Sequence, residues 1–100
     1  MFRGTTPTHM FEVDIDTELI KEVKIIYSHN DREILVKRAK DCTIANGIIQ
    51  TRLSQDDTFL FENNILVTIQ LRVLTFGGDA LTSDPIVLAV KECLDDEVLV

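Results

Sequence analysis

The residues able to carry chemistry are few, and they lie far apart along the chain. There are two histidines, His9 and His29, and two cysteines, Cys42 and Cys93. A structural or catalytic zinc site needs several converging nitrogen or sulfur ligands, and neither histidine has a second histidine close by in sequence. Cysteine catalysis needs a positioned base, which neither cysteine has as a sequence neighbour. We therefore expect no metal site, no cofactor and no catalytic residue.

Adjacent acidic residues and paired glycines also favour ordinary structure. Asp56-Asp57 and Asp95-Asp96 resemble carboxylate pairs, but neighbouring side chains on an extended chain point to opposite faces and cannot act as an acid/base dyad. Gly77-Gly78 is too short for a phosphate-binding loop and predicts a tight turn. No spaced Asp-x-Asp-x-Asp-Gly loop for calcium is present. The sequence predicts a protein that is not an enzyme.

Composition predicts one folded, acidic domain over residues 1–100. Hydrophobic residues make up 45% and charged residues 27% of the chain, which is the balance of a globular protein. No apolar run is long enough to span a bilayer. The formal charge of -7 repels phosphate backbones and anionic lipid, so neither nucleic acid nor a membrane is expected as a partner.

The opening residues and the cysteines bear on the compartment. The stretch from Met1 to Pro7 lacks the apolar core of a secretion signal, so we expect synthesis in a cytosol. Cys42 and Cys93 are then expected to be reduced structural thiols. A bridge between them stays open as an alternative if their strands prove to be neighbours.

Short alternating segments separated by turn signals run through the chain. Phe11 to Ile15 alternates apolar and acidic side chains, as a strand with one buried face does. Asn46-Gly47 between two apolar runs is the strongest hairpin signal, because both residues adopt positive φ easily. Strands are expected over residues 11–15, 23–27, 33–39, 42–44, 48–53, 65–75 and 81–91. This spacing predicts an all-β sandwich of two antiparallel sheets with about seven strands.

Details of three segments refine this prediction. Residues 17–25 also fit a short helix, and Ser54 three residues before Asp57 predicts a single capped helical turn. Residues 65–75 alternate over the longest stretch, which predicts a central strand. Pro85 has no backbone donor, so it predicts an edge, a bulge or a strand entry.

Three stretches resemble a known family: Met1 to His9, Asp41-Cys42-Thr43 and Gln70 to Asp84. They are similar to small prophage-encoded proteins of Gram-positive bacteria and, more loosely, to the immunoglobulin-like N-terminal domain of phage upper-baseplate proteins. The resemblance covers nearly the whole chain. It implies an immunoglobulin-like sandwich and a structural role in a virion, tail or baseplate. It also implies synthesis in the bacterial cytoplasm and a final location in the virion.

The first functional hypothesis is therefore a non-enzymatic phage or prophage protein that assembles with itself or with a larger phage structural protein. The candidate contacts are Phe76, at a loop tip, and the apolar residues Val98, Leu99 and Val100. Basic residues gather between residues 21 and 40 and acidic ones between 92 and 97. This polarity either guides head-to-tail association or marks solvated faces.

Two other hypotheses remain. A sandwich can present loops to a carbohydrate or cell-surface ligand. The absence of tryptophan and the single tyrosine argue mildly against such a binding module, since aromatic side chains usually stack on sugars. An inhibitor that works by acidic mimicry is favoured only by the net charge.

Overall fold

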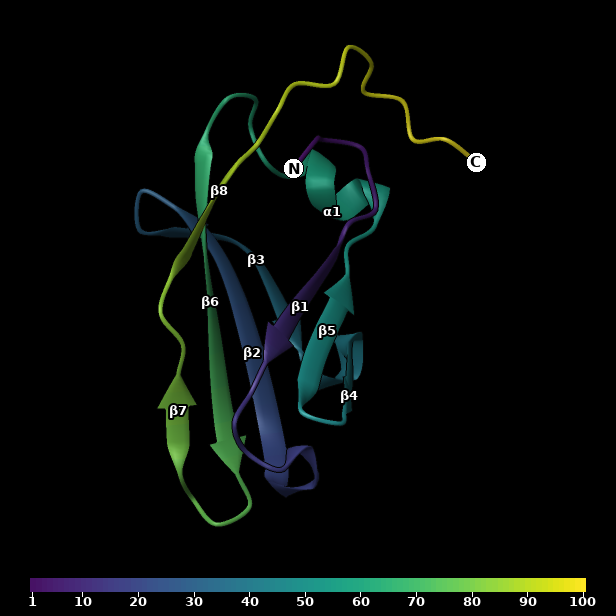
Figure 1. Ribbon diagram of the computed structural model, residues 1–100. Helices are drawn as coiled ribbons and strands as arrows, with labels where there is room; N and C mark the ends of the chain where they lie inside the picture. The colour runs from purple at the N-terminus through teal and green to yellow at the C-terminus, as the bar shows by residue number, and fades with distance from the viewer.

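The computed structural model describes all 100 residues and is a two-layer β structure with eight strands (Figure 1). Its smaller sheet has the order β1-β5-β4, and its larger sheet the order β3-β2-β6, with β7 and β8 both pairing with the free side of β6. All strand pairs are antiparallel. The strands are β1 (Thr8–Glu12), β2 (Ile20–His29), β3 (Arg32–Arg38), β4 (Cys42–Ala45), β5 (Ile48–Arg52), β6 (Leu66–Thr75), β7 (Ala80–Thr82) and β8 (Ile86–Ala89). The predicted all-β architecture of two antiparallel sheets is confirmed.

Local turn chemistry places the hairpins where the sequence predicts them. Asn46 and Gly47 have φ angles of 53° and 76° and join β4 to β5. Asn30 and Asp31 have φ angles of 50° and 62° and join β2 to β3. Consecutive residues with positive φ match the right-handed twist of the paired strands.

The last predicted strand, residues 81–91, is wrong as one continuous element. It is divided between β7, which pairs with residues 72–74 of β6, and β8, which pairs with residues 66–69. At the break, the Leu71 N–H donates to the Ser83 side-chain oxygen at 2.9 Å. Pro85 then lacks the N–H that a continuous ladder would use. This break accounts for eight strands in place of about seven.

Two other boundaries differ from the prediction. The first strand covers Thr8–Glu12 instead of 11–15, because the chain leaves the sheet after the Val13 N–H donates to the Gly47 carbonyl at 2.9 Å. The helical alternative for 17–25 applies only to η1 (Thr17–Leu19), one 3₁₀ turn that Asp16 caps.

The core lies between the sheets and is built from alternate residues of the strands. On β2 and β6 these include Val23, Ile25, Tyr27, Val67, Ile69, Leu71 and Val73; on the smaller sheet they include Phe11 and Ile49. Tyr27 is fully buried and packs against Phe61 with ring centroids 5.9 Å apart. Each large apolar side chain buried in this way contributes roughly 1.5–3 kcal/mol.

One side of the sandwich is closed by the chain itself. The 3₁₀ turn η2 (Ala39–Asp41) carries the chain from β3 in the larger sheet directly to β4 in the smaller sheet. On the opposite side, the edge of β1 and the edge formed by β7 and β8 have no strand between them (Figure 1). We call this the open side.

The short helix α1 (Gln55–Phe59) is held by a capping box and an ion pair. Ser54 accepts a hydrogen bond from the Asp57 N–H at 3.0 Å, and Asp57 accepts one from the Ser54 N–H at 2.9 Å. The Lys37 ammonium lies 2.8 Å from Asp57, with both side chains less than a fifth exposed. Lys37 therefore points inward from β3, and Asp57 is its counter-charge.

Replacing Asp57 with alanine should lower the free energy of unfolding by about 2–4 kcal/mol. The change leaves the inward Lys37 ammonium unpaired and removes half of the capping box. Urea unfolding measures this loss. Asp56→Ala is the matched control, because Asp56 is exposed in the same helical turn and should change stability by no more than about 0.5 kcal/mol. Equal losses for the two variants would contradict the structural role of the ion pair.

Candidate functional site

The main concavity of the protein is an apolar groove along the open side. Its volume is about 670 Å³, and eight of its thirteen lining residues are hydrophobic. One wall is formed by residues 10–15, which include β1, and the other by residues 81–84 of β7 and the following turn together with Ile86 of β8. Leu71 and Val73 of β6 line it as well. Both sheets therefore contribute to the same groove.

The backbone of β1 has hydrogen-bonding groups that face this side. The Leu53 N–H donates to the Pro7 carbonyl and the Val13 N–H to the Gly47 carbonyl, each at 2.9 Å. Residues facing the partner strand alternate in an antiparallel ladder. The N–H and C=O groups of Thr8, Met10 and Glu12 therefore point away from β5, toward the open side.

The sheet edges differ in how they are protected. An inward-pointing charge on an edge strand discourages the addition of another strand, because pairing would enclose the charge. Edge strand β3 has such a residue in Lys37, which pairs with Asp57. The inward side chains of β1, β7 and β8 include Phe11, Leu81 and Ile86, and none of them is charged. The two edges beside the groove therefore lack this protection. The β4 edge also has uncharged inward side chains, Cys42 and Ile44, but it lies on the side that η2 closes.

The charges around the groove all have one sign. Glu12, Asp14 and Asp84 line it, and no lysine or arginine does. The groove therefore combines an apolar lining with an acidic rim, and it favours an apolar ligand that carries positive charge.

The predicted contact residues lie elsewhere. Phe76 is 69% exposed in the β6–β7 turn, where its N–H donates to the Leu19 carbonyl at 2.9 Å. Val98, Leu99 and Val100 are exposed in the C-terminal segment, which crosses the opposite end of the molecule near α1 (Figure 1). The structure does not bring Phe76 together with this segment, and their role in binding stays a prediction.

The exposed aromatic side chains form no common surface. Phe2 pairs with Lys91, just beyond β8, whereas Phe76 lies in the β6–β7 turn and Tyr27 is fully buried. A carbohydrate platform formed by neighbouring exposed rings has no counterpart in this arrangement.

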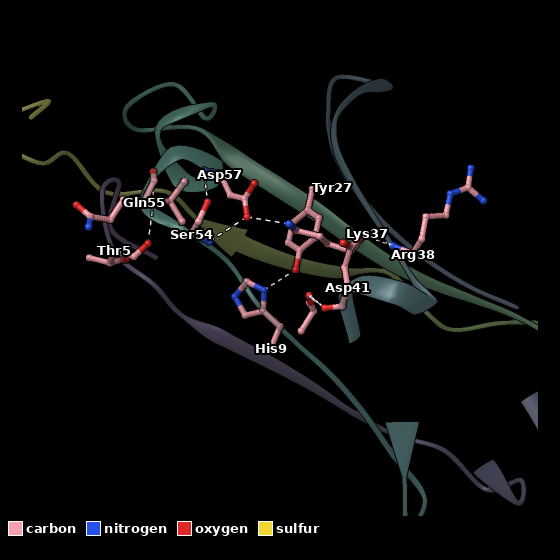
Figure 2. A network of polar contacts seen from close by, with 11 residues as sticks. Thr5, His9, Tyr27, Lys37, Arg38, Asp41, Ser54, Gln55 and Asp57 are labelled. Carbon is pink, nitrogen blue, oxygen red and sulfur yellow. Dashed lines mark hydrogen bonds and ion pairs between the residues drawn. The ribbon is translucent and has the colours of Figure 1, made fainter. Parts of the chain in front are cut away.

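A network of polar contacts includes one of the two histidines, His9 (Figure 2). The Tyr27 hydroxyl lies 2.6 Å from Nδ1 of His9. Close by, Thr51 donates to the Asp41 carbonyl at 3.1 Å, and Thr58 donates to the Thr5 carbonyl at 2.9 Å. These bonds link β1 to β2, β5 to η2, and α1 to the segment that precedes β1.

Burial shifts the pKa values of His9, Tyr27 and Cys42 toward their uncharged forms. Burial, followed by the positive N-terminus, lowers the pKa of His9. Burial, with Cys42 and Asp57 nearby, raises the pKa of Tyr27. Burial also raises the pKa of the Cys42 thiol, although a hydrogen bond with Thr51 acts in the other direction. The imidazole is therefore held neutral and the thiol protonated, whereas a nucleophilic cysteine needs a thiolate.

Asp57 and Lys37 form the ion pair of the network. Burial acts to raise its pKa, but hydrogen bonds from Lys37 and Ser54 outweigh burial, and the pKa is lowered. Asp57 therefore stays ionised beside the Lys37 ammonium, in keeping with its role as counter-charge.

The remaining candidate residues do not converge. Cys42 and Cys93 are both half-buried free thiols, so the alternative of a bridge between them is not realised. His29 contacts the Leu66 carbonyl at 2.9 Å in the β2–β3 hairpin. No three His, Cys, Asp or Glu side chains gather in a way that would hold a metal ion.

Sequence reasoning identified the walls of the groove as strands but missed the groove itself. The alternation of Phe11, Val13 and Ile15 predicted a buried face, and Pro85 predicted an edge, a bulge or a strand entry. Only the strand order brings these two segments to the same side of the sandwich.

None of the helices has the length and apolar character needed to cross a membrane. The chain matches no protein-family model, no curated protein and no solved structure. Its function is therefore inferred from its own sequence and geometry.

The lowered pKa of His9 predicts a pH-dependent stability. The unfolded chain binds the His9 proton more tightly than the folded protein, so stability should fall as pH drops below the ordinary histidine pKa of about 6.5. Thermal melts between about pH 8 and pH 5 should show this loss, and His9→Gln should reduce the slope. His29→Gln is the matched control and should retain the wild-type slope. An unchanged slope in His9→Gln would refute the assignment.

Proposed function

We propose that this chain is a non-enzymatic structural or interaction protein of a phage or prophage particle, which acts by protein–protein assembly through its open side. The observation that supports this role is the apolar groove between two sheet edges that lack inward charges. Soluble proteins usually guard such edges, and an unguarded edge beside an apolar surface is a place for another chain to pair.

We also infer that the sandwich is immunoglobulin-like and that no strand within residues 1–100 occupies the position of strand A beside β1. Immunoglobulin domains have one sheet in the order A-B-E-D and the other built on G-F-C, with C′ added in variable domains. The order β1-β5-β4 corresponds to B-E-D, and β7/β8-β6-β2-β3 corresponds to G-F-C-C′. Tyr27 lies buried on β2, where immunoglobulin domains carry a buried aromatic on strand C. In this correspondence strand A would pair with the open edge of β1.

The phage setting is supported by the resemblance of the segments Met1 to His9 and Gln70 to Asp84 to small prophage-encoded proteins. The second of these segments covers most of β6 and all of β7, including Leu71, Val73 and Leu81 of the groove. A virion, tail or baseplate protein needs docking surfaces more than it needs catalytic groups, which agrees with an apolar groove as the main surface feature.

The partner we favour is a larger structural protein of the particle. Two copies of this chain would bring two acidic rims together, and each copy carries a formal charge of -7. Like charges that face each other across a contact oppose association. A partner with positive charge at its docking segment meets no such repulsion.

The isolated protein should therefore be a monomer of 11.3 kDa in solution. Light scattering after size exclusion, over a range of protein concentration and at low salt, measures the absolute mass. A defined dimer or ring under these conditions would contradict the choice of partner and point to self-assembly.

The chain should also be present in purified particles, and its retention should depend on the groove. Particles produced by a lysogenic host that encodes the chain can be analysed by mass spectrometry. Ile86→Lys puts a charge into the groove and should prevent incorporation. Thr43→Lys is the control, because Thr43 is exposed on β4, at the other edge of the smaller sheet from β1, and does not line the groove. Absence of the wild-type chain from particles would contradict the proposed function.

A further inference from the structure

We infer that the open side binds an extended strand donated by the partner, which lies between β1 and the β7–β8 edge. This inference rests on the proposed function and specifies the chemistry of the docking segment. The donated strand runs parallel to β8 and alternates apolar side chains, which enter the groove, with neutral or basic side chains, which face the rim.

The direction of the donated strand follows from the N-terminal residues. Residues 1–3 already form a short parallel ladder beside the end of β8. The Met1 ammonium donates to the Ala89 carbonyl at 2.7 Å, the Lys91 N–H to the Met1 carbonyl at 2.7 Å, and the Arg3 N–H to the Lys91 carbonyl at 3.2 Å. This ladder covers only the end of the edge. A strand that extended it along the rest of β8 would lie over the groove.

The same direction suits the opposite wall. The β1 arrow runs opposite to the β7 arrow, so a strand parallel to the β7–β8 edge is antiparallel to β1 (Figure 1). The free N–H and C=O groups of Met10 and Glu12 then face it in the orientation of an antiparallel ladder. On the other wall, the Val90 N–H donates to the Ile65 carbonyl, so every second residue back along β8 faces β6. The N–H and C=O of Val87 lie between these positions and therefore face the open side. Each wall therefore offers main-chain partners to the incoming strand.

The size of the groove fits a short strand. Its walls are lined by residues 10–15 on one side and by residues 81–86 on the other. Six extended residues span about 20 Å at roughly 3.3 Å per residue. The inward positions of the donor would meet Phe11, Leu71 and Ile86, so apolar side chains at every second position are needed.

The acidic rim determines which side chains suit the outward positions of the donated strand. Glu12, Asp14 and Asp84 are the only charged residues that line the groove. A lysine or arginine at an outward position of the donor, or at its ends, would be attracted to these carboxylates, whereas a glutamate would be repelled. Charge complementarity therefore selects a basic donor.

The chain's own C-terminal segment does not have this chemistry. Residues 95–97 are all acidic and would face the acidic rim. In the structure the segment is held elsewhere, since the Gln55 side chain bonds both the N–H and the C=O of Leu99 at 2.8 Å, and Asp96 lies 3.0 Å from Arg3. A separate protein is thus the better source of the donor strand.

Synthetic peptides test this chemistry directly on the full chain. The probe is Lys-Val-Thr-Val-Lys-Val, compared with a peptide of the same composition in which the three valines are adjacent. A third peptide has glutamate in place of each lysine. The alternating basic peptide should bind with calorimetrically measurable affinity and raise the melting temperature. Ile86→Lys should weaken its binding by at least about tenfold, and Thr43→Lys, at an exposed position of β4 that does not line the groove, should leave it unchanged.

A fused variant provides the second measurement. The alternating basic sequence placed directly before Met1 should continue the ladder of residues 1–3 into the groove. This variant should melt at a higher temperature than the wild type, and it should no longer bind the free peptide. A fusion of the peptide with adjacent valines is its control and should do neither.

Three results would overturn the inference. The first is equal binding of the peptide with adjacent valines, which indicates nonspecific adsorption. The second is an equal effect of the Ile86 and Thr43 variants, and the third is failure of both the free and the fused strand. If the chain is retained in particles but binds no peptide, the donated strand is refuted and the proposed function stands. If the chain binds the peptide but is absent from particles, the proposed function is refuted and the strand-binding chemistry stands.

Discussion

The rest of the structure depends on the pairing of β2 with β6. These are the two longest strands, and their register brings Val23, Ile25 and Tyr27 opposite Val73, Leu71 and Ile69. Every one of these side chains is buried, so the pair forms the floor on which the smaller sheet packs. A one-residue slip would turn all of them to solvent, which is why alternation along both strands specifies the register so strongly.

The two edges of the larger sheet, on either side of this pair, differ in structure. On the β3 side, Lys37 points inward and is neutralised by Asp57, and η2 carries the chain across to the smaller sheet. On the β7–β8 side, no charge points inward and no strand crosses to β1. The same domain therefore has one closed, protected side and one side where pairing groups and apolar surface remain available.

Features that depend on neighbouring residues could be predicted from the sequence. The Asn46-Gly47 hairpin, the Ser54 capping box and the alternation of β6 each depend on a few adjacent side chains, and each is confirmed. The break between β7 and β8 was missed, because the Ser83 side chain replaces a backbone partner only once β6 lies beside it. The groove was missed for a similar reason. Its walls are separated by about two thirds of the chain, and nothing local signals that they meet.

The floor of the groove is covered although no strand lies between β1 and the β7–β8 edge. Leu71 and Val73 line the groove, yet they are only 4% and 5% exposed, because the flanking strands already cover most of their surface. The core residues beneath the groove are therefore covered without another strand, whereas Met10, Leu81 and Ile86 at its walls are still exposed. What a partner strand adds is a row of main-chain hydrogen bonds and the filling of alternate side-chain positions. Backbone pairing of this kind supplies affinity, while the side-chain positions supply specificity. A sandwich with one edge left open is thus suited to accept a strand from a partner.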